Sequence, residues 1–236
     1  MRLDKFISSQ TGNSRSDVKT AVRKGLVSVN GVAVKSADAQ IDPQTDKVKF
    51  SGNDIIYKEF LYIMLNKPQG VICATKDRLS ETVMALLPEN LRRQGLFPAG
   101  RLDKDTEGFV FITDDGQLAH KILSPKNHIP KTYYCELERD FEEYYIKEFK
   151  DGITFRTGEK CRPAELIKGE NPKTCEVIIC EGMFHQVKKM FEVVGNRVVF
   201  LKRIRMGNLD LDPNLALGEG REIMHKEQLL LTDNFE

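Results

Sequence analysis

The 236-residue sequence predicts an α+β protein made of a small N-terminal domain and a larger second domain. Two observations lead to this prediction. Residues 1–58 combine short helical patterns with a hairpin signal, and the rest of the chain alternates apolar strand-like runs with segments of helical spacing. Because residues 51–54 are turn-rich, we place the boundary between Ser51 and Glu59, which gives domains 1–58 and 59–236.

Composition indicates a globular protein of a reducing compartment. The five cysteines are odd in number and widely spaced, and no two form a Cys-x-x-Cys pair, which argues against a zinc site and a disulfide framework. No apolar run approaches the roughly 20 residues that cross a bilayer, and the first residues lack the apolar core of a signal peptide. We therefore expect a cytoplasmic protein that has no membrane partner.

The charge is distributed unevenly although the net charge is +1. Residues 1–58 hold 10 lysines and arginines against 6 acidic residues, and the remainder holds 26 against 29. A basic head on a mildly acidic body suggests that the head meets a polyanion. Ordinary scatter of surface charge is the alternative interpretation.

The basic residues of the head fall on a predicted helix. Ser14 is a suitable N-cap for a helix that runs to Lys24. Within it Arg15, Lys19 and Arg23 recur every four residues and share one face. Like charges at this spacing repel, and a phosphate backbone beside them would remove that cost. The alternative is a solvated helix face.

A hairpin follows this helix in the prediction. Apolar residues alternate through residues 26–34 around Asn30-Gly31, which is the strongest short-range hairpin signal. Residues 47–50 add a further alternating strand, and Leu3, Phe6 and Ile7 indicate a short first helix. Two helices and a small sheet make a compact unit.

The segments RLDKFI, SR with the basic helix, and GLVSVNG resemble the S4 RNA-binding domain over about residues 1–50. The resemblance implies that the basic helix and the hairpin loop at Asn30 face structured RNA. Phosphate contacts of this kind position an RNA without specifying its sequence. The candidate RNA contacts are Arg2, Lys5, Arg15, Lys19, Arg23, Lys24 and Asn30.

The second domain opens with an apolar strand at residues 60–65, which runs into the loop 66–70 set by proline and glycine. Lys67 in this loop is a further candidate phosphate ligand, and a plain strand-end lysine is the alternative. Residues 82–87 predict a short helix that Pro88 stops.

The most informative stretch is residues 100–116, GRLDKDTEGFVFITDDG. It places a charged loop directly before the apolar run 109–112, which predicts a buried strand. Carboxylates and an arginine on a loop entering a core strand are costly unless they are paired or used. Two interpretations compete. Asp103 and Asp105, with Asp114 and Asp115, could gather Mg²⁺ for phosphoryl transfer, or one carboxylate could act as a nucleophile.

A nucleophilic carboxylate must stay ionised, so it needs a fixed cation nearby. Arg101 is one candidate, and the segment His185-Gln186-Val187-Lys188-Lys189 supplies others. Four apolar residues have the spacing of a buried helical seam around that segment. They are Phe184, Val187, Phe191 and Val194.

The remaining strands carry an aromatic pair and a basic run. Residues 129–137 alternate as a strand, so one of Tyr133 and Tyr134 faces inward, where it could stack a planar base or remain an ordinary core aromatic. Residues 200–207 alternate basic and apolar residues, which predicts cations on one sheet face.

In order, the segments YIMLNKPQGVI, GRLDKDTEGFVFITDDGQLAH, KTY, EGMFHQVKKMF and RIRMGNL resemble the pseudouridine synthases of the Rsu type. The signature G-R-L-D-x-D-T-x-G is shared with the related large-subunit enzymes of the Rlu type. Lys188 departs from the pattern, because many relatives carry arginine there, and a lysine pairs as a point charge.

The resemblance implies a mixed, mainly antiparallel sheet with flanking helices and a cleft across it. It implies a monomeric enzyme that isomerises a uridine of 16S ribosomal RNA, of the type that modifies position 516, without a cofactor or metal. The implied catalytic residues are Asp103, Tyr133, Lys188 and Arg101. A large-subunit enzyme of the same chemistry, a non-catalytic assembly factor and a metal-dependent phosphotransferase remain as alternatives.

Overall fold

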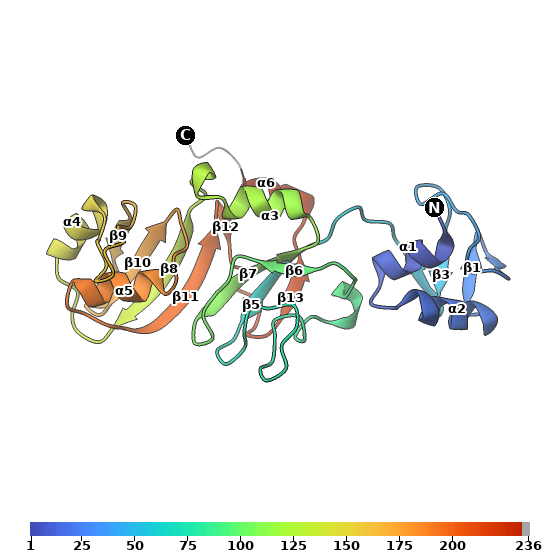
Figure 1. Ribbon diagram of the computed structural model, residues 1–236, viewed down its shortest axis with the longest axis horizontal. Coiled ribbons are helices and arrows are strands. Elements are labelled where there is room, and N and C mark those ends of the chain that lie inside the picture. Colours follow the sequence, from blue (N-terminus) through green and yellow to red (C-terminus); the bar gives the residue numbers. More distant parts are fainter. Residues whose placement is uncertain (233–236) are drawn as a thin grey trace. The chain divides into compact units, whose positions relative to one another are not determined.

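A computed structural model describes residues 1–232, and it divides into two compact units (Figure 1). Residues Met1–Leu61 and Leu87–Leu96 form the first unit, and Tyr62–Leu86 with the rest of the chain form the second. The domain boundary after residue 58 stays a prediction. None of the helices described is long and apolar enough to span a membrane.

The first unit packs two helices on a small antiparallel sheet. Helix α1 spans Leu3–Gln10 and α2 spans Arg15–Arg23. Ser14 caps α2 with a capping box, because its side chain accepts from Asp17 N while the Asp17 carboxylate accepts from Ser14 N. The sheet order is β2-β1-β3-β4, with these strands at Val32–Ala33, Val27–Val29, Val48–Phe50 and Asn53–Ile55.

The predicted hairpin is present in this sheet. Asn30 and Gly31 join β1 to β2 and both have a positive φ, 52° and 83°, as a tight hairpin turn requires. Apolar faces of both helices and of β1 and β3 meet in one core. Leu3, Phe6, Ile7, Val18 and Val27 are fully buried or nearly so in it.

The second unit is built on one mixed sheet of nine strands among the described residues. The main path runs β13-β5-β7-β11-β8-β10-β9, with β12 on β11 and β6 on β7. All pairs are antiparallel except β7 with β11, which confirms the mixed, mainly antiparallel sheet. The strands are β5 Tyr62–Lys67, β6 Phe97–Ala99, β7 Glu107–Thr113, β8 Lys131–Leu137, β9 Glu165–Lys168, β10 Thr174–Ile179, β11 Val198–Met206, β12 Leu209–Asp210 and β13 Gly220–Glu222.

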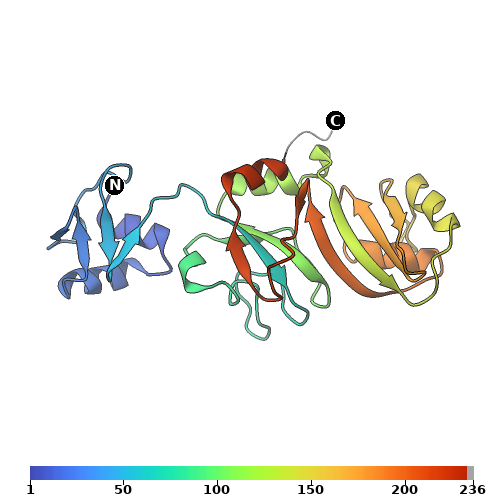
Figure 2. The same cartoon turned by 180° about the vertical axis from the view of Figure 1, so that it is seen from behind.

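Helices flank this sheet, as predicted. Helix α3 (Gly116–Leu123), capped by Asp115, and α6 (His225–Leu230) lie side by side in both views (Figures 1 and 2). Helices α4 (Tyr144–Asp151) and α5 (Gln186–Val193) lie beside the part of the sheet that β8–β11 form. The short helix predicted at residues 82–87 is wrong. Those residues form turns, and a single 3-10 turn, η1 (Glu89–Leu91), follows Pro88.

Candidate active site

Asp103 lies on the loop between β6 and β7, and the strand holding that loop is rigid. Phe109, Val110, Phe111 and Ile112 of β7 are all completely buried, as the apolar run predicts. At the end of the loop, Gly108 has φ +102° and pairs in parallel with Arg203 of β11. A Cβ there would lie 2.2 Å from the Arg203 carbonyl oxygen, so only glycine allows this approach.

Lys67 holds the same loop from the other side, and its side chain bonds to the backbone of that loop instead of lying open to a phosphate. Its side chain is fully buried, and Nζ donates to the carbonyl oxygens of Pro68 (2.9 Å), Lys104 (3.3 Å) and Thr106 (2.8 Å). An ammonium has three donors, so none remains for a phosphate. Burial lowers the pKa of Lys67 from its usual value. Lys67 therefore anchors the Asp103 loop.

Lys188 of α5 pairs with both carboxylates of this loop. Its Nζ lies 3.3 Å from Asp103 Oδ2 and 2.6 Å from Asp105 Oδ1, and its side chain is 19% exposed. The bond from Lys188 lowers the pKa of Asp105. A single ammonium thus lies between the two carboxylates. Many relatives in the family that the sequence resembles carry arginine at this position. The lysine also occupies the place that a shared metal ion would need between Asp103 and Asp105.

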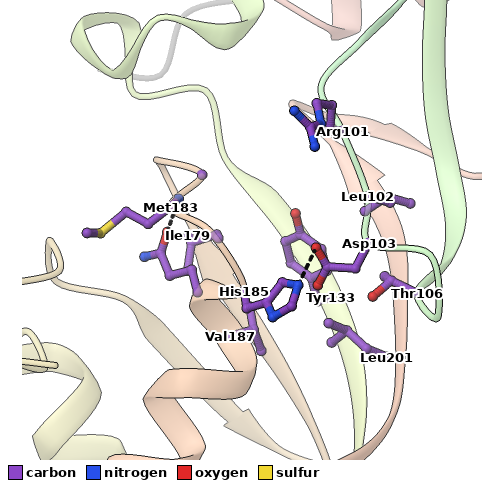
Figure 3. Close-up of a pocket in the computed structure, with 12 residues that line it drawn as sticks. Arg101, Leu102, Asp103, Thr106, Tyr133, Ile179, Met183, His185, Val187 and Leu201 are labelled. Atoms are coloured by element: carbon purple, nitrogen blue, oxygen red, sulfur yellow. Dashed lines mark hydrogen bonds and ion pairs between the residues drawn. The ribbon is translucent and has the colours of Figure 1, made fainter. Parts of the chain in front are cut away.

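His185 contacts the other oxygen of Asp103. Its Nε2 lies 3.5 Å from Asp103 Oδ1, and Figure 3 shows the imidazole facing this carboxylate. The Asp103 side chain is 26% exposed, so it remains open to a reactant between these two partners. His185 has a left-handed backbone, φ 53°, immediately before α5 begins.

Arg101 lines the same pocket without pairing with Asp103. Within residues 1–232 it forms no ion pair, and Figure 3 shows its guanidinium apart from the contact between Asp103 and His185. Of the two cations predicted to pair with Asp103, the structure brings Lys188 to it and leaves Arg101 exposed at the rim. Its position at the pocket is compatible with gripping a phosphate.

Tyr133 is the inward-facing member of the aromatic pair. It is 8% exposed and lines the pocket behind Asp103 (Figure 3). Tyr134, the next residue of the strand, points to the other face of β8 and is half-buried. Leu102, Ile179, Val187 and Leu201 complete an apolar lining. A flat ring beside a carboxylate, within apolar walls, suits a planar base better than a flexible chain.

Sequence reasoning missed the role of Arg203, which it placed among cations on one sheet face. Arg203 is 2% exposed, and Nε donates to Phe109 O (2.7 Å) while the other nitrogens reach Gly100 O (3.2 Å) and Tyr133 Oη (3.5 Å). A register shift in β11 after Arg203 breaks the simple alternation. The alternation therefore could not assign this residue a face. Arg203 ties the start of the Asp103 loop to Tyr133.

The helical seam on α5 is confirmed at three positions and wrong at the fourth. Val187, Phe191 and Val194 are buried, but Phe184 is 70% exposed. Helix α5 begins only at Gln186, and the left-handed His185 breaks the helical phase before it. Phe184 instead stacks on His185, with ring centroids 3.8 Å apart and planes at 20°.

The candidate RNA contacts of the first unit divide into free and engaged side chains. Lys5, Arg15, Lys19, Arg23 and Lys24 are exposed and make no ion pair within the described residues. Arg2 is engaged by the buried Asp4 at 2.9 Å. Asn30 donates to Asp46 and accepts from Lys47 N, so its amide maintains the hairpin.

Comparison with known proteins identifies the family to which this fold and pocket belong. A family model described as RNA pseudouridylate synthase matches residues 61–193, and an S4 domain model matches residues 1–46. The chain belongs to the RNA pseudouridylate synthase family and carries an N-terminal S4 domain, which implies RNA binding.

Relatives match over nearly their full length. An uncharacterized RNA pseudouridine synthase, YtzG, of Bacillus subtilis is 46% identical, with 99% of both chains covered. Ribosomal small subunit pseudouridine synthase A is 42% identical in Yersinia pestis, over 96% of both chains, and 40% identical in Escherichia coli K12, over 96% of this chain and 98% of that one. A crystal structure of a pseudouridylate synthase is similar at a TM-score of 0.69 and 40% identity, covering 98% of this chain and 99% of that one.

Proposed function

We propose that this protein isomerises one uridine of small-subunit ribosomal RNA to pseudouridine, with Asp103 as the nucleophile. The observation that carries the proposal is the Asp103 carboxylate, which Lys188 and His185 hold on two sides beside the Tyr133 ring. The relatives named for small-subunit modification support the choice of RNA. Position 516 of 16S RNA is the expected target, the cytoplasm the expected location, and a monomer the expected state.

The reaction rearranges one nucleoside without net loss or gain of atoms. Asp103 attacks C1′ of the target, the bond from C1′ to N1 breaks, and the freed uracil turns within the pocket. C5 then forms the new bond to C1′ and displaces Asp103, N1 takes up a proton and C5 loses one. Proton removal at C2′ is an alternative first step. Each version requires an ionised and oriented carboxylate, and a fixed cation beside the carboxylate keeps it in that state.

The pocket residues fit the demands of this sequence. A base inside folded RNA must be extruded, at a cost of a few kcal/mol. The Tyr133 ring offers the extruded uracil a stacking surface, and the apolar walls keep it in place while it turns. The Tyr133 hydroxyl can form a hydrogen bond with the base or move a proton. Arg101 at the rim suits a flanking phosphate or the space that the uridine leaves.

Mapping pseudouridines in ribosomal RNA from a strain lacking the protein tests the target. We expect the loss of one small-subunit site and its return with the wild-type gene. Loss of a large-subunit site would instead favour the same chemistry on the larger RNA, and an unchanged map would contradict the proposal.

Release of tritium from RNA labelled at C5 of uridine tests the nucleophile. Asp103→Asn keeps the side-chain volume but cannot attack C1′, so turnover should vanish while RNA binding persists. Asp140→Asn, at an exposed aspartate outside the pocket lining, is the matched control and should retain turnover. Activity remaining in Asp103→Asn would refute the assigned role.

A further inference from the structure

An exposed aromatic ring stands beside the pocket. Phe184 is 70% exposed, and Phe60, in the other unit, is the next most exposed phenylalanine among the described residues at 39%. Phe184 stacks on His185, whose imidazole reaches Asp103. Single exposed apolar residues are common, so the surroundings of the ring decide whether it has a role.

The segment that presents the ring is rigid. Gln186 is 4% exposed, its Oε1 accepts from Met183 N at 2.9 Å, and its Nε2 donates to Glu181 at 2.6 Å. His185 keeps a left-handed backbone that costs about 1 kcal/mol or more in a residue other than glycine. A strained backbone persists only when its surroundings fix it. The exposed position of Phe184 is therefore built into the fold.

The partners of the ring are those of a nucleobase platform. His185 stacks on it with ring centroids 3.8 Å apart and planes at 20°, and Lys189 Nζ lies over the ring, 5.1 Å from its centroid. Aromatic side chains bind bases of any sequence by stacking, and a neighbouring cation pairs with the phosphate of the same nucleotide. Within this small area the surface offers a planar apolar face together with a positive charge.

We propose that Phe184, supported by His185, stacks a base of the substrate RNA next to the target uridine, and that Lys189 pairs with the phosphate of that nucleotide. This inference rests on the proposed function. Extruding a uridine leaves its neighbours without a stacking partner, and the missing stacking energy weakens binding of the RNA in its extruded form. His185 spans from Asp103 to Phe184, so the platform begins one side chain away from the nucleophile. The adjacent nucleotide of the same strand is within that reach.

A competing role is purely structural, because Phe184 could serve only to hold His185 against Asp103. The two roles affect different steps. A base platform acts on RNA binding, whereas a support for His185 acts on the chemistry at Asp103. Measurements must therefore separate KM from the rate of a single turnover at saturating enzyme.

The first experiment compares Phe184→Ala, Phe184→Tyr and wild type on a small-subunit ribosomal RNA transcript. The platform predicts that Phe184→Ala raises KM about tenfold, which corresponds to the lower part of the range for one stacked base. Its single-turnover rate should stay within about twofold, and Phe184→Tyr should behave as wild type. Ile167→Ala in β9, 44% exposed and outside the pocket lining, is the control. A slower single turnover with an unchanged KM would overturn the proposal in favour of the structural role.

The second experiment removes the base instead of the ring. Short RNAs spanning the mapped uridine carry an abasic nucleotide on its 5′ or its 3′ side. Wild type should bind one of these abasic RNAs about tenfold more weakly than the intact RNA. Phe184→Ala should bind that abasic RNA as tightly as wild type binds it, because the base that would stack on Phe184 is already absent. If the losses of affinity caused by Phe184→Ala and by the abasic nucleotide multiply when both are present, the platform proposal is overturned. A wild type that forms no pseudouridine would refute the proposed function, whereas an active wild type with unaffected Phe184→Ala would refute this inference alone.

Discussion

The cations of helix α2 and the cations around the Asp103 loop differ in what holds them. On α2, Arg15, Lys19 and Arg23 are exposed and have no ion pair within the described residues. Around the loop, Lys67 and Arg203 are buried, and backbone carbonyls accept from each of them. Both groups consist of lysine and arginine, yet the first leaves its charge available and the second uses it internally.

The difference shows what a positive charge can do in an RNA-modifying protein. An exposed cation displaces counterions from a phosphate backbone and adds affinity that salt weakens. A buried cation instead fixes the atoms that it bonds, because leaving any of them unpaired is costly. Lys188 lies between these extremes, with a side chain 19% exposed and two carboxylate partners. The comparison predicts distinct consequences for each group.

Removing Lys188 should have the largest effect on catalysis. Lys188→Ala leaves Asp103 and Asp105 close together without their shared cation, and truncation of such a pair costs about 2–5 kcal/mol when it is buried. Allowing for the partial exposure of Asp103, we expect single turnover about 100-fold slower. Lys188→Arg should restore most of the rate, and Lys150→Ala on α4 is an exposed control. A tritium-release rate within about threefold of wild type for Lys188→Ala would refute the pairing role.

Arg203→Met should lower the stability of the protein and also its turnover rate. The variant keeps an apolar side chain but leaves the carbonyls of Phe109 and Gly100 without their donor. The free energy of unfolding should fall by about 3 kcal/mol in all. At this chain length each kcal/mol lowers Tm by about 2–4 °C. Arg205→Met, on the same strand with an exposed side chain, should change Tm by much less. Equal Tm shifts for the two variants would contradict the contrast between buried and exposed cations.

Sequence patterns predicted the architecture because periodicity reports which face of an element is buried. The hairpin at Asn30-Gly31, the buried strand β7 and the α5 seam from Val187 onward are confirmed for this reason. The seam position of Phe184 was wrong, and the burial of Lys67 and Arg203 was not foreseen, because each depends on something that periodicity does not contain. Lys67 is buried by contacts with a distant loop, Phe184 is displaced by a left-handed residue, and Arg203 precedes a register shift.

The candidate site was reached mainly through the resemblance, which supplied Asp103, Tyr133 and Lys188 together. Residue reasoning alone left a metal pair and a nucleophile open, since the chain separates Lys188 from Asp103 by more than 80 residues. Nothing in the spacing of Arg101 distinguished it from Lys188 as the partner of Asp103. Only the folded chain shows that α5 approaches the loop and that Arg101 stays at the rim.

Lys131 is a buried cation of a third kind, because no carboxylate among residues 1–232 pairs with it. It is 5% exposed, and burial, with Arg203 nearby, lowers its pKa to about 8. The unfolded chain keeps its lysine protonated to about pH 10.4. Below pH 8 both states are protonated and the cost of burial is fully present, and stability rises as pH increases from 8 toward 10.4.

Lys131→Met should therefore stabilise the protein at pH 7, by about 2 kcal/mol in urea unfolding. Its advantage over wild type should shrink at pH 8.5 and largely disappear near pH 10. Lys150→Met, which removes an exposed lysine, should show no such pH-dependent difference. A Lys131→Met protein less stable than wild type at pH 7 would mean that the ammonium has a favourable partner.

The smallest effect should come from the exposed group. Lys19→Ala combined with Arg23→Ala removes two charges that do not hold the fold together, so Tm should change by no more than about 1–2 °C. RNA affinity should fall, and the slope of log affinity against log salt should flatten by about 0.7–0.9 for each phosphate that is no longer neutralised. Lys150→Ala with Lys160→Ala removes the same charge from the second unit and serves as the control. If both double variants flatten the slope equally, net charge rather than the α2 stripe governs RNA binding, and if neither does, the stripe is an ordinary solvated helix face.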